Sequence, residues 1–272
     1  MTIRTMIDAH KDAASTETMP ALFVGHGSPM NGIEHNAFTS GWEKIGQTLP
    51  KPKAILVISA HWLTEGTLVH TSQSPKTIHD FYGFPEELYR LSYPAAGSPE
   101  FAQETIAAST NRIVGDSAWG LDHGTWIPLL RMFPHADIPV YQLSLDVTKS
   151  AAEHYALAKE LAILRRRGVL IMGSGNIVHN LRRVDFNPNA KIFDWAEEFD
   201  ARAKEFIEDH QHEKLIAYER MGDAANLAIP TPDHYWPLLY TLGLQEESDR
   251  VTFPIEGIMG GSISMRSVLI GM

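Results

Sequence analysis

The 272-residue sequence contains no cysteine, and this absence removes several classes of protein from consideration. Without thiols the chain cannot form disulfides, cysteine-ligated zinc modules, iron–sulfur clusters or a cysteine nucleophile. A transition metal bound to this protein must therefore be held by imidazole and carboxylate groups. The sequence has 13 histidines and 33 acidic residues to supply them.

The sequence also lacks long apolar runs and a surplus of basic residues. No stretch approaches the ~18 consecutive apolar residues that span a membrane, and the charged N-terminal segment has no apolar core of a secretory signal. With 23 basic against 33 acidic residues the formal net charge is −10, which argues against a nucleic-acid or anionic-membrane partner. We therefore expect a cytoplasmic protein. The charge balance says little about a small substrate, and the sequence carries no signal for the oligomeric state.

The length lies near the upper limit for one hydrophobic core. Hydrophobic residues make up 44% and charged residues 21% of the chain, as in ordinary soluble globular proteins. We expect residues 1–18 to form a flexible N-terminal extension and residues 19–272 to form a single catalytic domain.

Short apolar runs alternate with longer amphipathic segments along the chain. The apolar runs predict buried strands at 21–24, 54–59, 68–72, 138–145, 169–172, 251–255 and 262–270. The longer segments predict helices at 40–49, 99–110, 150–167 and 191–210, and the apolar segment after Pro232 predicts another. This alternation predicts an α/β fold with a central mixed, mostly parallel sheet flanked by helices. Such folds place their functional sites at the carboxyl ends of the strands.

Three predicted strand ends lead into a histidine: His26, His61 and, through a glycine-rich turn, His179. A single histidine of this kind is more often a hydrogen-bonded core residue than a ligand. Three that converge on one sheet edge favour a metal site, because neutral imidazole is the commonest protein ligand for zinc and iron. Three protein ligands with an open position would make such a site catalytic rather than structural.

Two further histidines have rigid surroundings. His123 precedes a glycine and His234 follows two prolines, and the acidic residues just before them, Asp122 and Asp233, are candidates to orient their rings. His79 lies in an aromatic, glycine-containing segment that could line a pocket for a planar ligand or simply pack as a loop. The sequence contains neither a nucleophile elbow nor a nucleotide-binding glycine motif.

Seven segments in order along the chain resemble the class III extradiol ring-cleaving dioxygenases, and most closely the 4,5-DOPA dioxygenase branch. These segments are Gly25-His26-Gly27-Ser28-Pro29-Met30, Ser59-Ala60-His61-Trp62, Thr77-Ile78-His79-Asp80-Phe81, Trp119-Gly120-Leu121-Asp122-His123-Gly124, Gly173-Ser174-Gly175-Asn176, Val178-His179-Asn180-Leu181 and Pro230-Thr231-Pro232-Asp233-His234-Tyr235. The resemblance extends from about Met19 to the C-terminus.

The resemblance implies a site for a non-heme Fe(II) ion, with Zn(II) as a possible occupant. By position, His26, His61 and His234 correspond to metal ligands. His179 corresponds to an acid/base residue or a further metal contact, and His123 to a residue that lines the active site. The wider class uses two histidines and a glutamate. The third histidine here makes an all-imidazole site that retains zinc readily.

The implied reaction is cleavage of a catechol such as L-DOPA by O₂ to a ring-opened semialdehyde. His179 would take a catechol proton, and His123 would donate a hydrogen bond to O₂ or to a substrate oxygen. Zinc has a filled d shell and would not support this redox step. Two alternatives remain at this point: a zinc-dependent hydrolase with His179 or His123 as base, and a metal-binding relative without catalytic activity.

Overall fold

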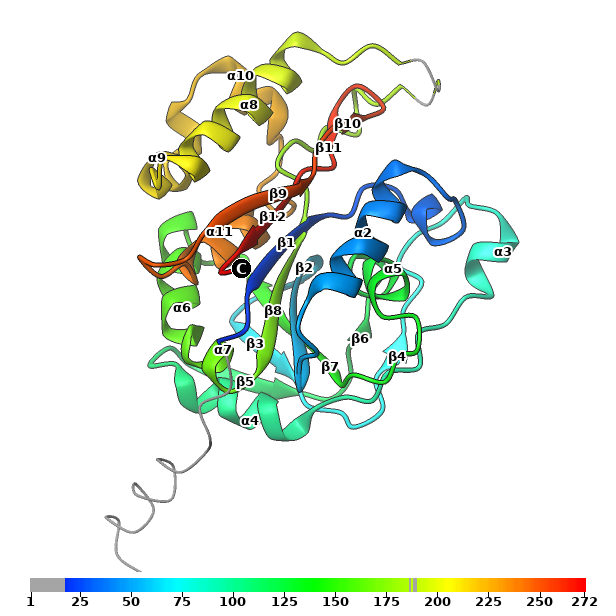
Figure 1. The fold of residues 1–272 in the computed structure, drawn as a ribbon, viewed down its shortest axis with the longest axis vertical. Helices are drawn as coiled ribbons and strands as arrows, with labels where there is room; N and C mark the ends of the chain where they lie inside the picture. The colour runs from blue at the N-terminus through cyan, green and yellow to red at the C-terminus, as the bar shows by residue number, and fades with distance from the viewer. Residues whose placement is uncertain (1–17, 186, 188–189) are drawn as a thin grey trace, which may run out of the picture.

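The computed structural model describes residues 18–185, 187 and 190–272 of the chain. The extension predicted at 1–18 lies outside these residues, apart from Thr18. An eight-stranded sheet of order β5-β3-β7-β2-β8-β1-β12-β9 runs through the molecule (Figure 1). Its strands are β1 (Ala21–Gly25), β2 (Ala54–Thr64), β3 (Thr67–His70), β5 (Ile113–Asp116), β7 (Val140–Asp146), β8 (Val169–Gly175), β9 (Val251–Ile255) and β12 (Ser267–Ile270). Two small sheets pair β4 (Lys76–Thr77) with β6 (Gly120–Leu121), and β10 (Ile258–Met259) with β11 (Ile263–Ser264).

The centre of the large sheet is parallel and its margins are mixed. β7, β2, β8 and β1 run parallel to one another, and β3 runs parallel to β5. β3 pairs with β7, and β12 with both β1 and β9, in antiparallel fashion. The predicted fold class is therefore confirmed. The carboxyl ends of β1, β2 and β8, where the sequence places three histidines, meet at one edge of the sheet.

Helices cover both faces of the sheet (Figure 1). They are η1 (Pro29–Gly32), α2 (Ala37–Thr48), α3 (Glu86–Tyr89), α4 (Pro99–Ala108), α5 (His123–Met132), α6 (Ala151–Leu161), α7 (Ile163–Arg166), α8 (Asp194–Glu208), α9 (His212–Ile216), η2 (Tyr218–Arg220), α10 (Asp223–Ala228) and α11 (Trp236–Gly243). α2 and α5 pack together on one face, and α6 and α11 on the other. α8, α9 and α10 form a further helical layer beside β11 and α11.

Side-chain alternation along β1 divides the core into two clusters. Ala21 and Phe23 belong to the cluster on the side of α6 and α11. Leu22 and Val24 belong to the cluster that includes Trp42 of α2. Both faces of the strand are buried, which explains why its sequence is continuously apolar rather than alternating.

The strand predicted from the sequence is shorter than β2 in the structure. The apolar run suggested a strand over 54–59, but β2 continues to Thr64 and includes His61. Pairing with β8 stops at Ser59, and the register with β7 shifts between Ile58 and Leu63. His61 therefore lies within a strand, but in a part of it where regular pairing has been interrupted.

Helix α5 was absent from the prediction. It is buried around most of its circumference and contains Pro128, so its sequence has no amphipathic stripe to reveal it. The helix predicted over 150–167 is divided at Ala162 into α6 and α7.

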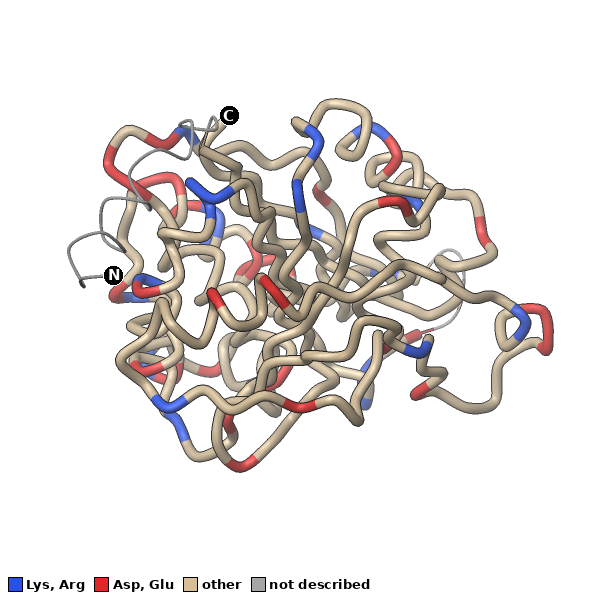
Figure 2. Tube along the Cα trace, turned by 90° about the horizontal axis from the view of Figure 1, so that it is seen from below, with Lys and Arg blue, Asp and Glu red and all other residues tan. Residues whose placement is uncertain are grey.

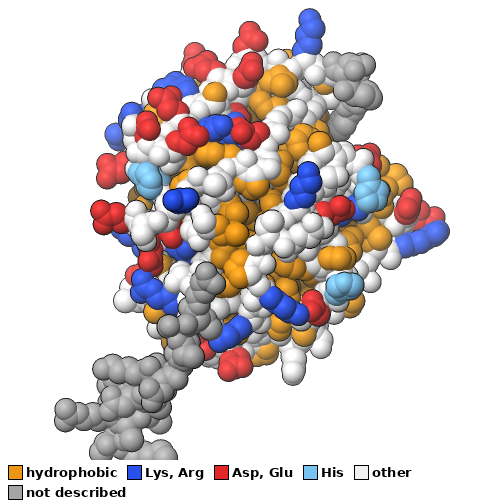
Figure 3. All heavy atoms as spheres, viewed as in Figure 1, with side chains coloured by type: hydrophobic (Ala, Val, Ile, Leu, Met, Phe, Trp, Pro, Cys, Tyr) orange, Lys and Arg blue, Asp and Glu red, His pale blue; other side chains and the backbone are white. Residues whose placement is uncertain are grey.

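Charged residues of both signs are spread along the outer parts of the trace (Figure 2). On the face shown in Figure 3 they surround patches of hydrophobic side chains. Within the part of the chain that the structure describes, helices that combine the length and apolar character needed to cross a membrane are absent.

Candidate metal centre

His26 follows directly after β1 and is held by its backbone and its ring. Its N–H donates to the carbonyl of Gly175, at 3.0 Å, and its Nδ1 lies 3.0 Å from Ser174 Oγ. The Ser174 hydroxyl donates its only proton to the carbonyl of Gly124. Ser174 must then accept from His26 Nδ1–H, which leaves the lone pair of His26 on Nε2. Burial, followed by the neighbouring histidines, lowers the pKa of His26 well below its usual value, so the ring is neutral.

His61 faces His26 across a short gap. The two Nε2 atoms lie 3.1 Å apart, and His61 lies where the register of β2 against β7 shifts. Burial, followed by neighbouring histidines, lowers the pKa of His61 well below its usual value. Two imidazole nitrogens bound to one metal at about 2.1 Å each would lie roughly 3.0–3.4 Å apart. The observed separation suits two ligands of the same ion.

His123 is the first residue of α5, and two carboxylates determine its place. Asp122 caps the helix by accepting from the N–H of Thr125 at 3.2 Å. Asp80 accepts from the backbone N–H of His123 at 2.8 Å and from its Nδ1–H at 2.9 Å. Burial acts to raise the pKa of Asp80, but its hydrogen bonds from His123 outweigh burial and the net pKa is lowered. Asp80 is therefore an ionised acceptor.

His234 and His179 stack on each other, with ring centroids 3.5 Å apart and an interplanar angle of 8°. The Nδ1 of His234 is hydrogen-bonded to the carboxylate of Asp233, as the sequence suggested for this pair. His179 is positioned through its backbone N–H, which donates to the carbonyl of Ala228 at 2.9 Å. Burial, followed by the charge of His234, lowers the pKa of His179 to about 2. His179 is therefore a neutral ring at physiological pH.

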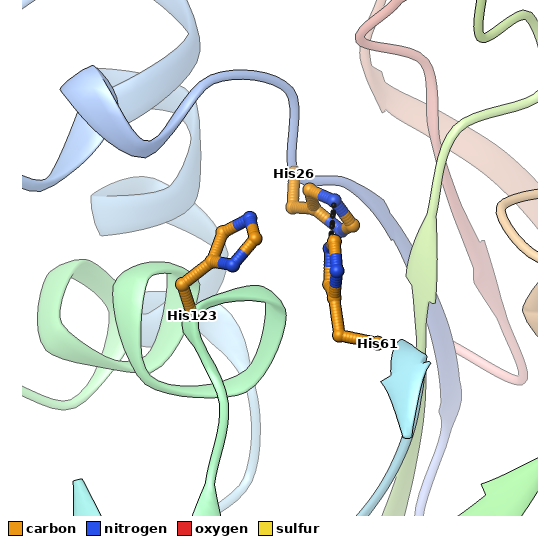
Figure 4. Close-up of side chains that lie close together, drawn as sticks. All are labelled: His26, His61 and His123. Atoms are coloured by element: carbon orange, nitrogen blue, oxygen red, sulfur yellow. Dashed lines mark hydrogen bonds between the residues drawn. The ribbon is translucent and has the colours of Figure 1, made fainter. Parts of the chain in front are cut away.

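The structure thus brings all five sequence-predicted histidines into one cluster. Within it, nitrogens of His26, His61 and His123 all lie within 4.8 Å of one another. Figure 4 shows these three rings converging from the end of β1, from β2 and from the start of α5. The ring centroid of His234 lies 5.3 Å from that of His26 and 5.0 Å from that of His61.

The donor set of this cluster fits a transition-metal ion. Its members are buried or partly buried imidazoles, and hydrogen bonds on Nδ1 of His26, His123 and His234 leave Nε2 of these rings to face the cluster. Such second contacts typically fix metal-binding histidines in position. The group of His26, His61 and His123 could hold a metal. The selection of His234 as a ligand and the catalytic role of His179 stay predictions.

Two positioning residues were missed by the sequence analysis, and one expectation was wrong. Asp80 and Ser174 lie within the quoted motifs, but neither is adjacent in sequence to the histidine it contacts. Asp122 was expected to orient the ring of His123, and that contact belongs to Asp80. The carboxylate of Asp122 instead accepts from Ser59 Oγ–H at 2.6 Å and from the Gln142 amide at 2.7 Å.

An aromatic group lies beside the cluster. The ring of Phe81 meets that of His123 edge-on, with centroids 5.6 Å apart at 86°, and packs against Tyr89 at 5.1 Å. His79 is tied to the loop, since its Nε2–H donates to the carbonyl of Leu91 at 3.0 Å. His79 therefore holds the loop in place, and its neighbours Asp80 and Phe81 contact the histidine cluster.

Comparison with known proteins agrees with this geometry. Residues 19–262 match the family described as the catalytic LigB subunit of aromatic ring-opening dioxygenase. The chain is 46% identical to the "4,5-DOPA dioxygenase extradiol" of Escherichia coli (strain K12), covering 94% of this chain and 96% of that protein. It is 39% identical to the protein of the same name from Beta vulgaris, covering 90% and 94%.

A solved structure shares the fold. The crystal structure of an uncharacterized protein from Escherichia coli K12 superposes with a TM-score of 0.82 at 43% identity, covering 93% of this chain and 100% of that chain. The family match spans most of the sequence and includes the five clustered histidines. The chain therefore belongs to the family of the catalytic LigB subunit of aromatic ring-opening dioxygenase, the class III extradiol enzymes.

Proposed function

We propose that this protein cleaves the aromatic ring of a catechol, with L-DOPA as the substrate, and incorporates both atoms of O₂ into a ring-opened semialdehyde. The observation that supports this most strongly is the convergence of His26, His61 and His123 at the carboxyl edge of the sheet, in a chain of the ring-opening dioxygenase family. The choice of DOPA is supported by the names of the relatives at 46% and 39% identity.

The proposed resident metal is Fe(II), held by His26, His61 and His234, with His179 in reach as a further contact. When bound, Fe(II) supplies open positions for the catechol oxygens and O₂, together with the redox capacity that Zn(II) lacks. Hydrogen bonds to Ser174 and Asp233 leave Nε2 of His26 and His234 free to ligate. Zn(II) is expected to occupy the same imidazoles without supporting ring cleavage.

The proposed proton acceptor is His179. A base must remove a proton from a catechol hydroxyl, and His179 is neutral because burial and His234 lower its pKa. Stacking on His234 fixes the plane of its ring. Phe81 lies against the ring of His123 and provides an apolar surface beside the cluster, which suits the aromatic face of the substrate.

Family membership favours this proposal over the two alternatives from the sequence. A zinc-dependent hydrolase would use the same imidazoles with a water nucleophile. A non-catalytic metal-binding protein would require only the ligands. Neither alternative consumes O₂, so the three functions differ in one measurable property.

The test is anaerobic reconstitution of the apoprotein with Fe(II), followed by addition of L-DOPA or catechol in air. We expect a yellow ring-fission product and matching O₂ uptake. The same protein loaded with Zn(II) should give neither. Colourless mixtures without O₂ uptake for every catechol tested would refute the proposal.

A further inference from the structure

The carboxylate of Asp80 faces the Nδ1 atoms of two rings of the histidine cluster, those of His123 and His61. Its Oδ2 is 2.9 Å from Nδ1 of His123 and 3.6 Å from Nδ1 of His61. We propose that Asp80 is a positioning residue that fixes His123 in the Nδ1–H tautomer and, once His61 ligates a metal through Nε2, stabilises Nδ1–H of that ring. Both rings then present an unprotonated Nε2 to the metal centre.

The tautomer of His123 follows from the chemistry of its partner. An ionised carboxylate only accepts hydrogen bonds, so the proton between Asp80 and His123 must lie on Nδ1. A neutral His123 then carries its lone pair on Nε2. This changes the role expected from the sequence, because His123 offers the site an acceptor and becomes a donor only once it is protonated.

Contacts of the neighbouring residues Ile78 and Phe81 with α5 fix the position of the Asp80 carboxylate. Trp126, on the same helix as His123, donates its indole N–H to the carbonyl of Ile78 at 2.9 Å. On the other side of Asp80, the ring of Phe81 packs against His123. The loop that carries Asp80 is therefore fastened to α5 before and after this residue, which gives the short, defined geometry that a positioning group needs.

A purely structural role for Asp80 is the competing explanation. Its Oδ1 accepts from the backbone N–H of His123, at the start of α5, where a negative charge is favourable. Asp80→Asn separates the two roles. The amide oxygen can still accept the backbone bond, whereas an amide NH₂ facing Nδ1 of His123 can only donate, which forces the proton of His123 to Nε2.

The experiment compares wild type with Asp80→Asn, Asp80→Glu and Glu87→Gln. Glu87 is an exposed carboxylate in the neighbouring helix α3, so Glu87→Gln reproduces the change in charge away from the cluster. ¹⁵N-histidine NMR of each apoprotein reports the tautomer of His123, and competition with a chelator reports its affinity for Zn(II). Thermal unfolding shows which variants are folded.

We expect Nδ1–H at His123 in wild type and Nε2–H in Asp80→Asn. Zn(II) affinity should fall about 10–100-fold in that variant, because Asp80 also faces Nδ1 of the proposed ligand His61. Asp80→Glu and Glu87→Gln should keep the wild-type tautomer and stay within a few-fold of its affinity. An unchanged tautomer and affinity in Asp80→Asn would overturn the inference, as would an equal loss in Asp80→Glu.

This inference rests on the proposed metal centre, but its failure can be told apart from failure of that proposal. A wild-type protein that binds no Zn(II) would count against the metal centre. The NMR readout of the apoprotein requires neither metal nor turnover, and it still decides whether Asp80 sets the tautomer of His123.

Discussion

Ser174→Ala is expected to weaken both the fold and the metal centre. The hydroxyl of Ser174 is buried, accepts from His26 Nδ1–H and donates to the carbonyl of Gly124. Alanine leaves both groups buried and unpaired, and each such group costs about 1–3 kcal/mol. The free energy of unfolding of the apoprotein should therefore fall by at least about 2 kcal/mol. Loss of the contact that orients His26 should lower Zn(II) affinity by about tenfold or more.

The sheet provides a matched control in Ser267→Ala. Ser267 is also fully buried, but among the described residues its hydroxyl has no hydrogen-bond partner. This substitution removes a buried hydroxyl that makes no hydrogen bond, so the free energy of unfolding should stay unchanged or rise. The assay is equilibrium urea unfolding of each apoprotein, followed by Zn(II) competition with a chelator. Equal effects of the two alanine substitutions on both quantities would refute the hydrogen-bonding scheme proposed for His26.

Three further predictions concern pH, substrate binding and packing. Because the pKa of His179 is lowered in the folded state to about 2, the unfolded chain binds more protons below about pH 6.5, and the apoprotein should lose stability as pH falls below that value. The urea midpoint of the wild-type apoprotein should decrease from pH 7.5 to pH 5, and it should decrease less in His179→Asn. The same decrease in both proteins would contradict a buried, neutral His179 ring. Phe81→Ala should raise KM for catechol about 2–10-fold, which is the contribution of one aromatic contact, while kcat changes less. Steady-state kinetics test this, and an unaltered KM would show that Phe81 does not contact the substrate. Gly175→Ala would place a Cβ 2.1 Å from the carbonyl oxygen of His234. The substitution should therefore destabilise the fold by about 1–3 kcal/mol and lower metal affinity. Wild-type values in thermal unfolding and Zn(II) titration would contradict this prediction.

The sequence was sufficient to predict the architecture because the parallel core consists of strands buried on both faces. Runs such as 54–59 and 169–172 are continuously apolar for that reason. The same logic failed for α5, whose buried surface has no polar face to reveal a helical period. The extension of β2 through His61 was also hidden, because it depends on a register shift against β7.

The histidines of the site could be predicted from the sequence, but most of the side chains that orient them by hydrogen bonds could not. The strand-end rule and the motifs brought together His26, His61, His123, His179 and His234, all of which the structure places in one cluster. Adjacency in sequence identified Asp233 as the partner of His234 but wrongly favoured Asp122 for His123. The true partner, Asp80, is 43 residues away in sequence and meets His123 only through the fold.

The central claim is that this histidine cluster binds the metal for cleavage of a catechol ring, with both atoms of O₂ incorporated into the product. The most direct measurement is mass spectrometry of the product that the Fe(II)-reconstituted protein forms from L-DOPA under ¹⁸O₂. The account predicts a ring-opened product that has gained both atoms of one O₂ molecule, with no such product from the Zn(II)-loaded protein. A product that carries no labelled oxygen, or equal activity with Zn(II), would contradict it.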